Sequence, residues 1–530
     1  MLAELIISFL VLAGYGGFLA KRLMTYLHAY QQEEYDSGRF IKWLLMNKVF
    51  DKKLSLILAI IGCLWFFLGE LDFLVSLLVL AAFGCIGYLE ADPRKKSKKK
   101  LAMTARAKRI YTIAFAFAFI PGVFVFFIHL PWIWIVLVQF IPLALTLANA
   151  SLKPYEEAAQ NKFWNEAHDK LNNLKPIVIG ITGSYGKTSV KHILGHILSN
   201  IAPTLITPGS VNTPMGITRI IREELDETHK YFIAEMGAYG IGSIERLCKL
   251  CPPDTGIITA IGHAHYERFK SLDAVAEAKF ELAQSVLSRS GKMIVHQKTL
   301  RFDHSAKIKN ENSGSFFVIG DTEDSNVILE RAEQTLEGLD IRIRWKDEVY
   351  ALEVPLFGLH HADNVALAFV CALTLGIDAE TIGQALKTTP QIPHRLEVKK
   401  LGATTLIDDA YNSNPLGFRS ALDLLYILGQ KKRKILITPG MVELGATHDD
   451  VHRQIGRVAA HSCNVAIAVN SSRIPSFVQG FRDEAREDQI LYEMDTFAQA
   501  QEWIQDNRQE GDVILLENDL PDVYERVPKL

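Results

Sequence analysis

Five apolar runs without a charged residue lie within the first 150 residues of this 530-residue chain. They occupy roughly 5–20, 54–69, 73–89, 112–128 and 131–150. At ~1.5 Å per residue each run spans about 24–30 Å as a helix, close to the hydrocarbon thickness of a bilayer. A central lysine or arginine would cost about 2.5–3.5 kcal/mol or more, so uncharged runs indicate about five transmembrane helices rather than soluble core helices. Only three residues separate the second and third runs, which leaves a re-entrant hairpin as the alternative there.

The basic residues of the connecting segments indicate how this helical bundle is oriented. Segment 94–109 contains nine lysines and arginines and segment 21–53 contains seven, whereas the turns near 70–72 and 129–130 contain none. By the positive-inside rule both basic segments lie in the cytoplasm, the N-terminus lies outside, and all residues after 150 are cytoplasmic. We therefore expect a multi-pass protein of the inner (plasma) membrane. Topology alone accounts for these charges; the alternative is attraction to anionic lipid headgroups, at about 1 kcal/mol per charge.

Charge and cysteine content argue against two other classes of protein. The formal net charge is −3, and no pattern in the sequence is typical of nucleic-acid binding. The six cysteines do not form a disulfide framework, since two lie in apolar runs. Cys248 and Cys251 form a lone C-x-x-C without the second ligand pair that a zinc site needs. We expect free cysteines in a reducing compartment.

After residue 150, short apolar strands alternate with helical segments. The candidate strands are 177–181, 231–235, 255–261, 404–408, 434–438, 465–469 and 512–516. Because helical patterns follow most of them, they indicate α/β layers with parallel strands. Residues 295–357 are richer in β-type residues and predict a small sheet. The expected organisation is a membrane domain over 1–150, a polar helical connector over 151–175, a central domain over 176–392 and a C-terminal domain over 393–530.

Residues 180–194 have the pattern of a phosphate-binding loop between a strand and a helix. The loop Thr182-Gly183-Ser184-Tyr185-Gly186-Lys187-Thr188-Ser189 follows an apolar run and precedes an apolar pattern of helical period. Glycines let backbone N–H groups close around phosphate oxygens, and the helix N-terminus adds its positive end. Lys187 is then placed to reach the β- and γ-phosphates of a nucleotide, and the Thr188 hydroxyl to hold Mg²⁺. The spacing is shorter than in a standard P-loop, because Ile181 stands where the first glycine is expected.

Two further groups are expected beside this loop, at the carboxyl ends of neighbouring strands. The strand 231–235 ends in Glu235. Ligands of open parallel sheets bind at strand carboxyl ends, so Glu235 is a candidate Mg²⁺ ligand beside Thr188. The strand 255–261 runs into Gly262-His263-Ala264-His265, which offers a histidine ligand. The alternatives are a surface glutamate that ends a strand and an ordinary loop histidine.

Lys279 lies on the apolar side of a predicted helix. That helix is expected over 272–287 with Ser271 as its N-cap. A lysine in such a place often extends its ammonium group to the edge of the helix. If the amine is buried instead, its pKa falls, and it can take up CO₂ to become a carbamate, an anion suited to a second Mg²⁺.

At these positions the chain resembles the Mur ligases, ATP-dependent amide-forming enzymes of cell-wall precursor synthesis. The loop 182–189 is similar to the family's T-G-x-x-G-K-T-[ST] segment. Other segments similar to family motifs are Asn212-x-x-x-Gly216, Ile261-Gly262-His263-Ala264-His265, Ala278-Lys279-x-Glu281, Gly358-Leu-His360-His361-Ala-Asp-Asn364, Arg395-Leu-Glu397, Asp408-Asp409-Ala-Tyr411-Asn412-Ser-Asn414-Pro415 and Gly440-Met441-Val442-Glu443-Leu444-Gly445. His361 departs from the pattern, since the family has asparagine there.

The resemblance implies roles for individual residues. The ATP-binding residues it implies are Gly183, Ser184, Tyr185, Gly186, Lys187, Thr188, Ser189, Asn364, Arg395 and Asp409. The metal ligands it implies are Thr188 and Glu235 for one Mg²⁺, and His265 and carbamylated Lys279 for a second. The catalytic residues would be Lys187, His265 and Lys279, and the candidate substrate contacts are Asn212, Tyr411 and Asn414. The asparagine at 364 would hold adenine, and the aspartate at 409 would contact ribose.

The resemblance also implies a fold and a reaction. The expected fold is an α-helical membrane domain followed by α/β: a P-loop central domain with a mostly parallel sheet and a small β subdomain, and a Rossmann-like C-terminal domain. Two motifs are closest to the branch of the family that adds D-alanyl-D-alanine to UDP-MurNAc-tripeptide through an acyl phosphate. ATP and two Mg²⁺ ions would be the cofactors. The expected partners are these two substrates, the bilayer and other membrane-associated wall-synthesis enzymes.

Two departures from the family concern substrate recognition. The apolar runs stand in place of the family's uridine-binding domain, and Glu517-Asn518-Asp519-Leu520 stands where the family pattern runs K-G-S-R. The open alternatives are the same chemistry on a lipid-linked muramyl peptide, synthesis of a poly-amino acid, and a non-catalytic membrane scaffold that binds ATP. The intact loop and metal set favour an enzyme, because a scaffold does not need them.

Overall fold

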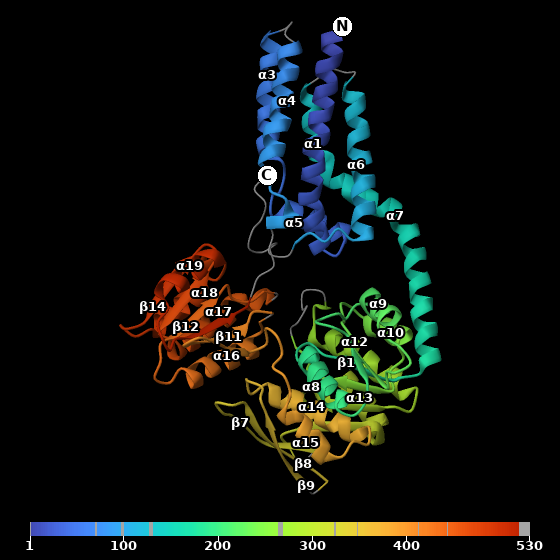
Figure 1. Ribbon diagram of the computed structural model, residues 1–530, viewed down its shortest axis with the longest axis vertical. Coiled ribbons are helices and arrows are strands. Elements are labelled where there is room, and N and C mark those ends of the chain that lie inside the picture. Colours follow the sequence, from blue (N-terminus) through green and yellow to red (C-terminus); the bar gives the residue numbers. More distant parts are fainter. Residues whose placement is uncertain are drawn as a thin grey trace. The chain divides into compact units, whose positions relative to one another are not determined.

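The chain forms two compact units in the computed structural model. The structure describes residues 2–68, 72–96, 100–126, 131–262, 269–322, 325–346, 348–411, 413–442 and 444–518. One unit comprises the N-terminal part up to Gln160, and the other runs from Asn161 to Asp519 (Figure 1). The first is helical and the second is built from two sheets covered by helices, so the change of pattern after residue 150 corresponds to a change of architecture.

The first unit is a bundle of apolar helices. Its helices are α1 (Leu2–Gln32), α2 (Ser37–Met46), α3 (Lys52–Leu68), α4 (Asp72–Leu89), α5 (Pro93–Lys96), α6 (Ala105–Phe126) and the first part of α7 (Pro131–Leu174). Helix α1 packs against both α4 and α6, and α3 packs against α4 (Figure 1). Side chains from these helices, such as Tyr15, Phe83 and Trp134, pack ring against ring in the centre of the bundle.

Four helices, rather than the expected five, are clearly long and apolar enough to cross a membrane. Among the described residues these spans are Ile6–Gln32, Phe73–Lys95, Ala105–Val125 and Trp132–Leu174. The remaining apolar run forms α3, whose 17 residues span about 26 Å, at the lower limit of hydrocarbon thickness. The composition and length of these helices therefore indicate membrane association.

A buried ion cluster closes one end of the bundle. Arg22 Nη1 lies 2.7 Å from Asp51 Oδ2, and Arg22 Nε lies 2.9 Å from Glu90 Oε2. All three side chains are at most 6% exposed. A charge next to an apolar span is tolerated where it is paired inside the protein, and these pairs join α1 to the ends of α3 and α4.

The expected polar connector over 151–175 is not a separate element. Helix α7 is continuous from Pro131 to Leu174, so the apolar run 131–150 and the polar segment after it belong to one helix. The polarity of the side chains changes along the helix while its backbone hydrogen bonding continues. The predicted connector is helical and ends with α7 at Leu174, but it continues the helix of the last apolar run.

A nine-stranded sheet forms the centre of the second unit's first half. Its strand order is β2 (Thr204–Ile206), β3 (Tyr231–Glu235), β1 (Ile177–Thr182), β4 (Thr255–Ile258), β5 (Lys292–His296), β6 (Phe316–Gly320), β7 (Val327–Gln334), β8 (Leu339–Trp345) and β9 (Glu348–Val354). The strands from β2 to β7 are parallel to their neighbours, and β7, β8 and β9 are antiparallel. The small sheet expected within 295–357 is thus the antiparallel end of the main sheet, because β6 and β7 pair directly.

Helices cover both faces of this sheet. One face packs against α8 (Lys187–Ser199), α14 (His361–Thr374) and α15 (Ala379–Lys387). The other packs against α9 (Pro214–Glu223), α10 (Ser243–Leu250), α12 (Leu272–Leu287), α13 (Asp303–Glu311) and the last turns of α7. Strands β3 and β2 lie on one side of β1, and β4 lies on the other. The strand order therefore reverses at β1, and ligands of such sheets bind at this point.

The C-terminal half of this unit contains a second, six-stranded sheet. Its order is β10 (Glu397–Leu401), β11 (Thr404–Asp409), β15 (Val513–Glu517), β12 (Lys434–Thr438), β13 (Val465–Val469) and β14 (Ile490–Met494). Only the β10–β11 pair is antiparallel. Helices α16 (Pro415–Leu428), α17 (His448–Ser462) and α18 (Pro475–Glu484) cover one face, and α19 (Phe497–Asn507) the other (Figure 1). This agrees with the expected α/β fold class.

Candidate functional site

The phosphate-binding loop connects β1 to α8, as the sequence predicts. Gly183 and Gly186 have φ angles of +150° and +83°, and Gly186 is the N-cap of α8. A Cβ at residue 183 would overlap the Thr259 hydroxyl, and a Cβ at residue 186 would overlap the Asn364 amide. Both positions therefore require glycine, because each combines a positive φ with a close approach to another side chain.

The end of β4 fixes the shape of this loop. Ser184 N donates to the Ala260 carbonyl at 2.7 Å, and Ser184 Oγ bonds with both the N–H and the carbonyl of Gly262, at 2.9 and 3.0 Å. The Thr259 hydroxyl donates to the carbonyl of Tyr185. These bonds fix the loop to the segment after β4, and a fixed loop lowers the ordering cost of phosphate binding.

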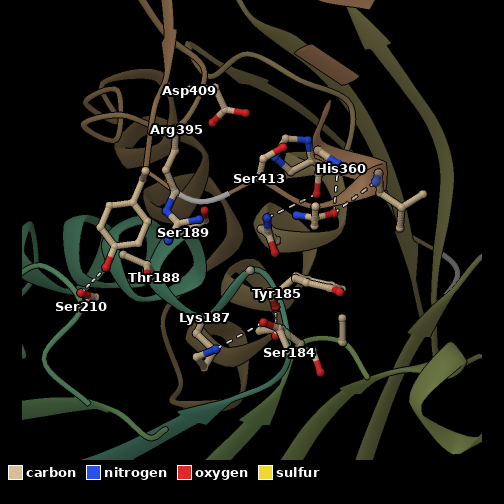
Figure 2. Close-up of a pocket in the computed structure, with 18 of the residues that line it drawn as sticks. Ser184, Tyr185, Lys187, Thr188, Ser189, Ser210, His360, Arg395, Asp409 and Ser413 are labelled. Carbon is tan, nitrogen blue, oxygen red and sulfur yellow. Dashed lines mark hydrogen bonds between the residues drawn. The ribbon is translucent and has the colours of Figure 1, made fainter. Parts of the chain in front are cut away.

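Lys187 and Thr188 begin α8 and point toward different partners. Lys187 Nζ donates to the Gly183 carbonyl at 2.7 Å, so the ammonium folds over its own loop (Figure 2). Burial lowers the pKa of Lys187, although the nearby Glu235 carboxylate opposes this effect. Thr188 Oγ1 donates to Glu235 Oε2 at 3.0 Å, so the two predicted metal ligands lie together. A hydroxyl and a carboxylate are hard oxygen donors, which suits Mg²⁺.

Lys191, which the sequence reasoning did not single out, is the ion-pair partner of Glu235. Its Nζ lies 2.9 Å from Glu235 Oε2, and the two side chains are 0% and 1% exposed. Burial by itself would raise the pKa of Glu235, but Lys191 and Lys187 together hold that pKa below its ordinary value. Glu235 is therefore an ionised carboxylate inside the protein, and the ammonium of Lys191 supplies its counter-charge.

Asn212 orients the same carboxylate from the opposite side. Asn212 Nδ2 donates to Glu235 Oε1 at 3.1 Å, and Asn212 Oδ1 accepts from the Tyr239 hydroxyl at 3.2 Å. The backbone N–H of Glu235 donates to Thr207 Oγ1. Asn212, predicted as a substrate contact, lines the cavity and also positions Glu235.

Lys279 is buried in α12, and Ser271 caps that helix as expected. The Ser271 side chain accepts from Ala274 N, and Lys279 is 4% exposed. Burial, together with the charge of Lys187, lowers the pKa of Lys279 well below its ordinary range. The alternative in which this lysine extends to the helix edge does not occur. His265 lies outside the described residues, so its predicted role remains a prediction.

A cavity of about 390 Å³ lies next to the loop and receives residues from both halves of the unit. The loop residues Ser184, Tyr185, Gly186, Lys187, Thr188 and Ser189 line one side (Figure 2). Asn364 from α14 lines it as well, and its Nδ2 atom bonds to the His360 carbonyl and His361 Nδ1, both at 3.3 Å. His361, which departs from the family pattern, is thus a direct neighbour of the predicted adenine ligand.

Arg395, Asp409, Tyr411 and Asn414 bring the C-terminal half to the same cavity. The Arg395 guanidinium lies over the Tyr411 ring, 4.6 Å from its centroid, and the Tyr411 hydroxyl donates to Ser210 across the cavity (Figure 2). The side chain of Asn414 caps α16, since its Oδ1 accepts from two backbone N–H groups. The residues predicted to bind nucleotide, other than Gly183, therefore line one cavity.

Asp409 forms a carboxyl pair that the sequence reasoning missed. Asp409 and Glu517 are register partners on the parallel strands β11 and β15, so their carboxyl groups lie close together on the same face of the sheet. Burial raises the pKa of Asp409 to about 6, against the effects of the Leu396 N–H and Arg395. Burial and the Asp409 charge raise the pKa of Glu517 well above its ordinary value.

Comparisons with known proteins agree with this architecture. Residues 181–372 match the Mur ligase middle domain, and residues 394–517 match the Mur ligase glutamate ligase domain. These two regions belong to the Mur ligase family. A UDP-N-acetylmuramoyl-tripeptide–D-alanyl-D-alanine ligase of Mycobacterium bovis is 30% identical over 295 residues, which cover 53% of this chain and 56% of that relative. The chain thus spans little more than half the length of this relative.

Two further likenesses point to the same branch of the Mur ligases. The ligase of that name from Bacillus subtilis is 26% identical over 351 residues, covering 65% of this chain and 73% of the relative. The crystal structure of MurF from Acinetobacter baumannii has 28% identity and a TM-score of 0.58, and the likeness covers 68% of this chain and 77% of that one. The chain is therefore a MurF-like Mur ligase preceded by an apolar helical region.

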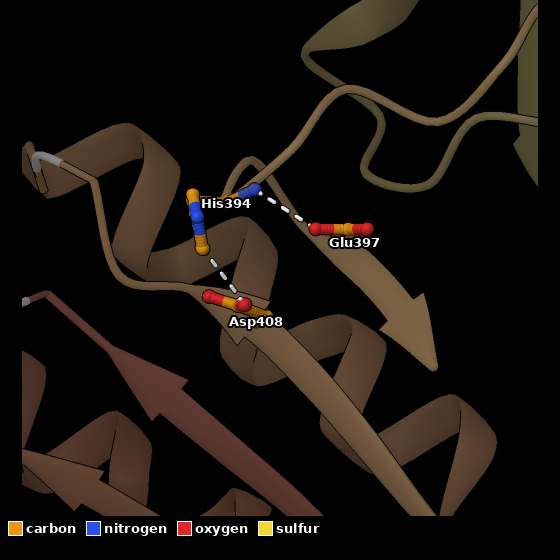
Figure 3. A group of neighbouring side chains, drawn as sticks. All are labelled: His394, Glu397 and Asp408. Atoms are coloured by element: carbon orange, nitrogen blue, oxygen red, sulfur yellow. Dashed lines mark hydrogen bonds and ion pairs between the residues drawn. The ribbon is translucent and has the colours of Figure 1, made fainter. Parts of the chain in front are cut away.

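A second cluster of ligand-type side chains in this Mur ligase is filled by a lysine. His394 Nδ1 lies 2.9 Å from Asp408 Oδ2, and the His394 N–H donates to Glu397 (Figure 3). The Lys399 ammonium lies 2.9 Å from both Glu397 and Asp408. Because the Lys399 ammonium pairs with both carboxylates, the cluster forms an ion-pair network at the start of the C-terminal domain.

Proposed function

We propose that this protein is an ATP-dependent amide ligase that adds D-alanyl-D-alanine to UDP-MurNAc-tripeptide through an acyl phosphate. The carrying observation is that the loop, the Thr188–Glu235 pair and the Asn364, Arg395 and Asp409 side chains meet at a single cavity. The likeness to relatives named for this reaction supports the proposal. Peptidoglycan precursor synthesis is the process it would serve.

The phosphate step solves a leaving-group problem. A carboxylate does not accept an amine at neutral pH, because oxide or hydroxide is a poor leaving group. Transfer of the γ-phosphoryl group from ATP to the tripeptide carboxylate releases ADP and leaves an acyl phosphate. The amine of D-alanyl-D-alanine then attacks the carbonyl carbon, the amide bond forms, and inorganic phosphate and a proton leave. Such phosphoryl transfer depends mainly on positioning and charge neutralisation.

The residues of the loop would supply that neutralisation. Lys187 would leave its own loop carbonyls and bind the β- and γ-phosphates. Thr188 and Glu235 would hold a Mg²⁺ ion, which screens the repulsion between the phosphate and the incoming carboxylate. The buried amine of Lys279, whose pKa is lowered, would take up CO₂, lose a proton and become a carbamate suited to a second Mg²⁺ with His265.

The nucleotide would join the two halves of the catalytic unit. Asn364 would hold adenine, and Arg395 with Asp409 would hold the ribose side. Tyr411 and Asn414 lie next to them and are the candidate contacts for the incoming peptide. Because these groups come from two domains, binding of ATP would assemble the site.

We also propose a location for the enzyme. The apolar helices would anchor it in the plasma membrane, and the two basic segments would lie in the cytoplasm together with the catalytic unit. The nucleotide cavity would then lie in the compartment that contains ATP. The N-terminus would then lie outside.

A two-substrate assay tests the proposed reaction. The detergent-solubilised full-length protein is incubated with ATP, Mg²⁺, UDP-MurNAc-tripeptide and D-alanyl-D-alanine, and mass spectrometry follows the pentapeptide and ADP. We expect equal amounts of both products. K187M should form neither, whereas K249M, which changes an exposed lysine, should match the parent protein. ADP release without pentapeptide would refute the substrate assignment.

A second candidate function follows from the helical region. The membrane helices stand where the family's uridine-binding domain is expected, so the acceptor would be a muramyl peptide linked to a lipid rather than to UDP. Parallel assays with soluble and lipid-linked tripeptide separate the two. A kcat/KM at least tenfold higher for the lipid-linked acceptor would favour this second candidate.

A further inference from the structure

Glu517 is a fully buried carboxyl group at the carboxyl end of β15. It is 0% exposed, and its backbone lies in register with Asp409 on the neighbouring parallel strand β11. Side chains in register on parallel neighbours project from the same face of the sheet, so the two carboxyl groups meet. The Ser413 hydroxyl donates to Glu517 Oε1, while Glu517 Oε2 is buried without a donor from the described residues.

Two ionised carboxylates at neighbouring register positions repel each other, and the repulsion is strong here because Glu517 is fully buried. A carboxylate only accepts hydrogen bonds, so a contact between two carboxyl groups requires a proton or a cation between them. The charged groups that face the pair are Arg395 and Asp408, and the Leu396 N–H donates to Asp409 Oδ1 at 3.2 Å. Arg395 and the Leu396 N–H both stabilise the charged form of Asp409. Asp409 is therefore the better-stabilised anion, and Glu517 is the group that keeps the proton.

We propose that Glu517 is a protonated carboxylic acid that donates a hydrogen bond to the Asp409 carboxylate and holds it toward the nucleotide cavity. Glu517 is a positioning residue, since Asp409 lines the cavity and Glu517 acts through it. The part of the inference that concerns nucleotide binding rests on the proposed function. The raised pKa values of both groups agree with one proton bound by the pair.

In this arrangement a shared proton takes the place of a positively charged partner for Asp409. A lysine at position 517 would lie beside Asp409 as a permanent counter-ion, whereas this chain has a carboxyl group there. A shared proton supplies the same partner only within a limited range of pH. Below the Asp409 pKa of about 6 both groups are neutral, and the acceptor charge is lost. When pH rises above the raised pKa of Glu517, both groups are ionised and repel each other.

Infrared difference spectroscopy on the full-length protein tests the proton without any ligand. At neutral pH we expect the parent protein to show a C=O stretching band of a buried protonated carboxyl group that E517Q lacks. E493Q, the same substitution on the edge strand β14, should retain the band, because Glu493 is paired with Arg482. The proposal would be overturned if the spectra of the parent protein and E517Q did not differ in this band. That result is expected if a cation, rather than a proton, joins the two groups.

Binding of MgADP between about pH 5 and 9 tests the positioning role. The affinity of the parent protein should fall toward both ends of this range. E517Q, whose amide can still donate to Asp409, should bind within a few-fold of the parent at neutral pH and lose the alkaline decline. E517L should bind about tenfold or more weakly, as expected for loss of a hydrogen bond to a charged group.

The outcomes separate the two hypotheses. Equal alkaline declines in the parent and E517Q, or equal affinities of E517Q and E517L, would overturn the positioning role. If the parent protein failed to bind MgADP at any pH, the proposed nucleotide site would be wrong. The infrared band would still decide whether Glu517 carries a proton.

Discussion

Replacing Lys191 by methionine should strongly destabilise the middle domain. The substitution keeps the length of the side chain but removes the cation that lies 2.9 Å from Glu235. Both side chains are almost completely buried, so water cannot screen the charge that remains. The Asn212 amide and the Thr188 hydroxyl still donate to Glu235, but neither supplies a positive charge.

The size of the effect follows from the burial of this pair. Breaking a buried ion pair by removing one partner costs about 3–5 kcal/mol, because the other charge is left uncompensated. For a domain of 150–250 residues, 1 kcal/mol shifts the melting temperature by about 2–4 °C. K191M should therefore lower the melting temperature of the middle domain by about 6–20 °C. The double variant K191M/E235Q should recover much of this loss, because it leaves no charge without a partner.

Scanning fluorimetry of the full-length protein in detergent measures these shifts in Mg²⁺-free buffer. Added Mg²⁺ should restore part of the stability of K191M, because the ion would bind the Glu235 carboxylate, and should not restore K191M/E235Q. K249M serves as the matched control at an exposed lysine. The reasoning would be refuted if K191M had the same melting temperature as K249M. It would also be refuted if the decreases in melting temperature caused by K191M and E235Q were additive in the double variant.

Three further predictions follow from the described contacts. K279A should abolish pentapeptide formation, and short-chain carboxylates should rescue it in part by occupying the place of the carbamate; full activity of K279A would exclude that role. G183A should weaken MgADP binding and lower stability by about 1–3 kcal/mol, because its Cβ overlaps Thr259 at a positive φ. The control is G376A, because Gly376 also has a positive φ but has open space around it. Calorimetry and melting curves compare MgADP affinity and stability in the two variants. In the folded chain the pKa of Glu517 lies above its ordinary value of about 4.5. The contribution of this protonated group to the free energy of unfolding is therefore largest at acidic pH, and it declines as pH rises, by up to about 1.4 kcal/mol per pH unit. Melting temperatures of the parent and E517Q should therefore diverge between about pH 5 and 8, and parallel curves would contradict the shift.

The sequence predicted the local features of the catalytic unit well. Each predicted strand is present, because a short apolar run before a helical pattern leaves few alternatives to a buried parallel strand. The loop 182–189 has the expected strand–loop–helix context. The loop glycines and the N-cap Ser271 also follow from residue type and helical period, whereas the sequence left open whether Lys279 is buried or reaches the helix edge.

Contacts between distant segments could not be predicted in this way. Lys191 is buried because Glu235, which lies 44 positions away, receives its charge. Glu517 meets Ser413 across 104 positions, so its neighbours depend on the order of the strands in the second sheet. The sheet also continues from β6 into the β7–β9 hairpins, and strand composition cannot distinguish such a continuation from a separate small sheet.

The lysine that fills the His394, Glu397 and Asp408 cluster has a consequence for the chemistry of the C-terminal domain. These three side chains offer an imidazole and two carboxylates whose ligand atoms lie within 4.8 Å of one another. The Lys399 ammonium pairs with both carboxylates, so a metal ion would have to displace this lysine to use the same oxygens.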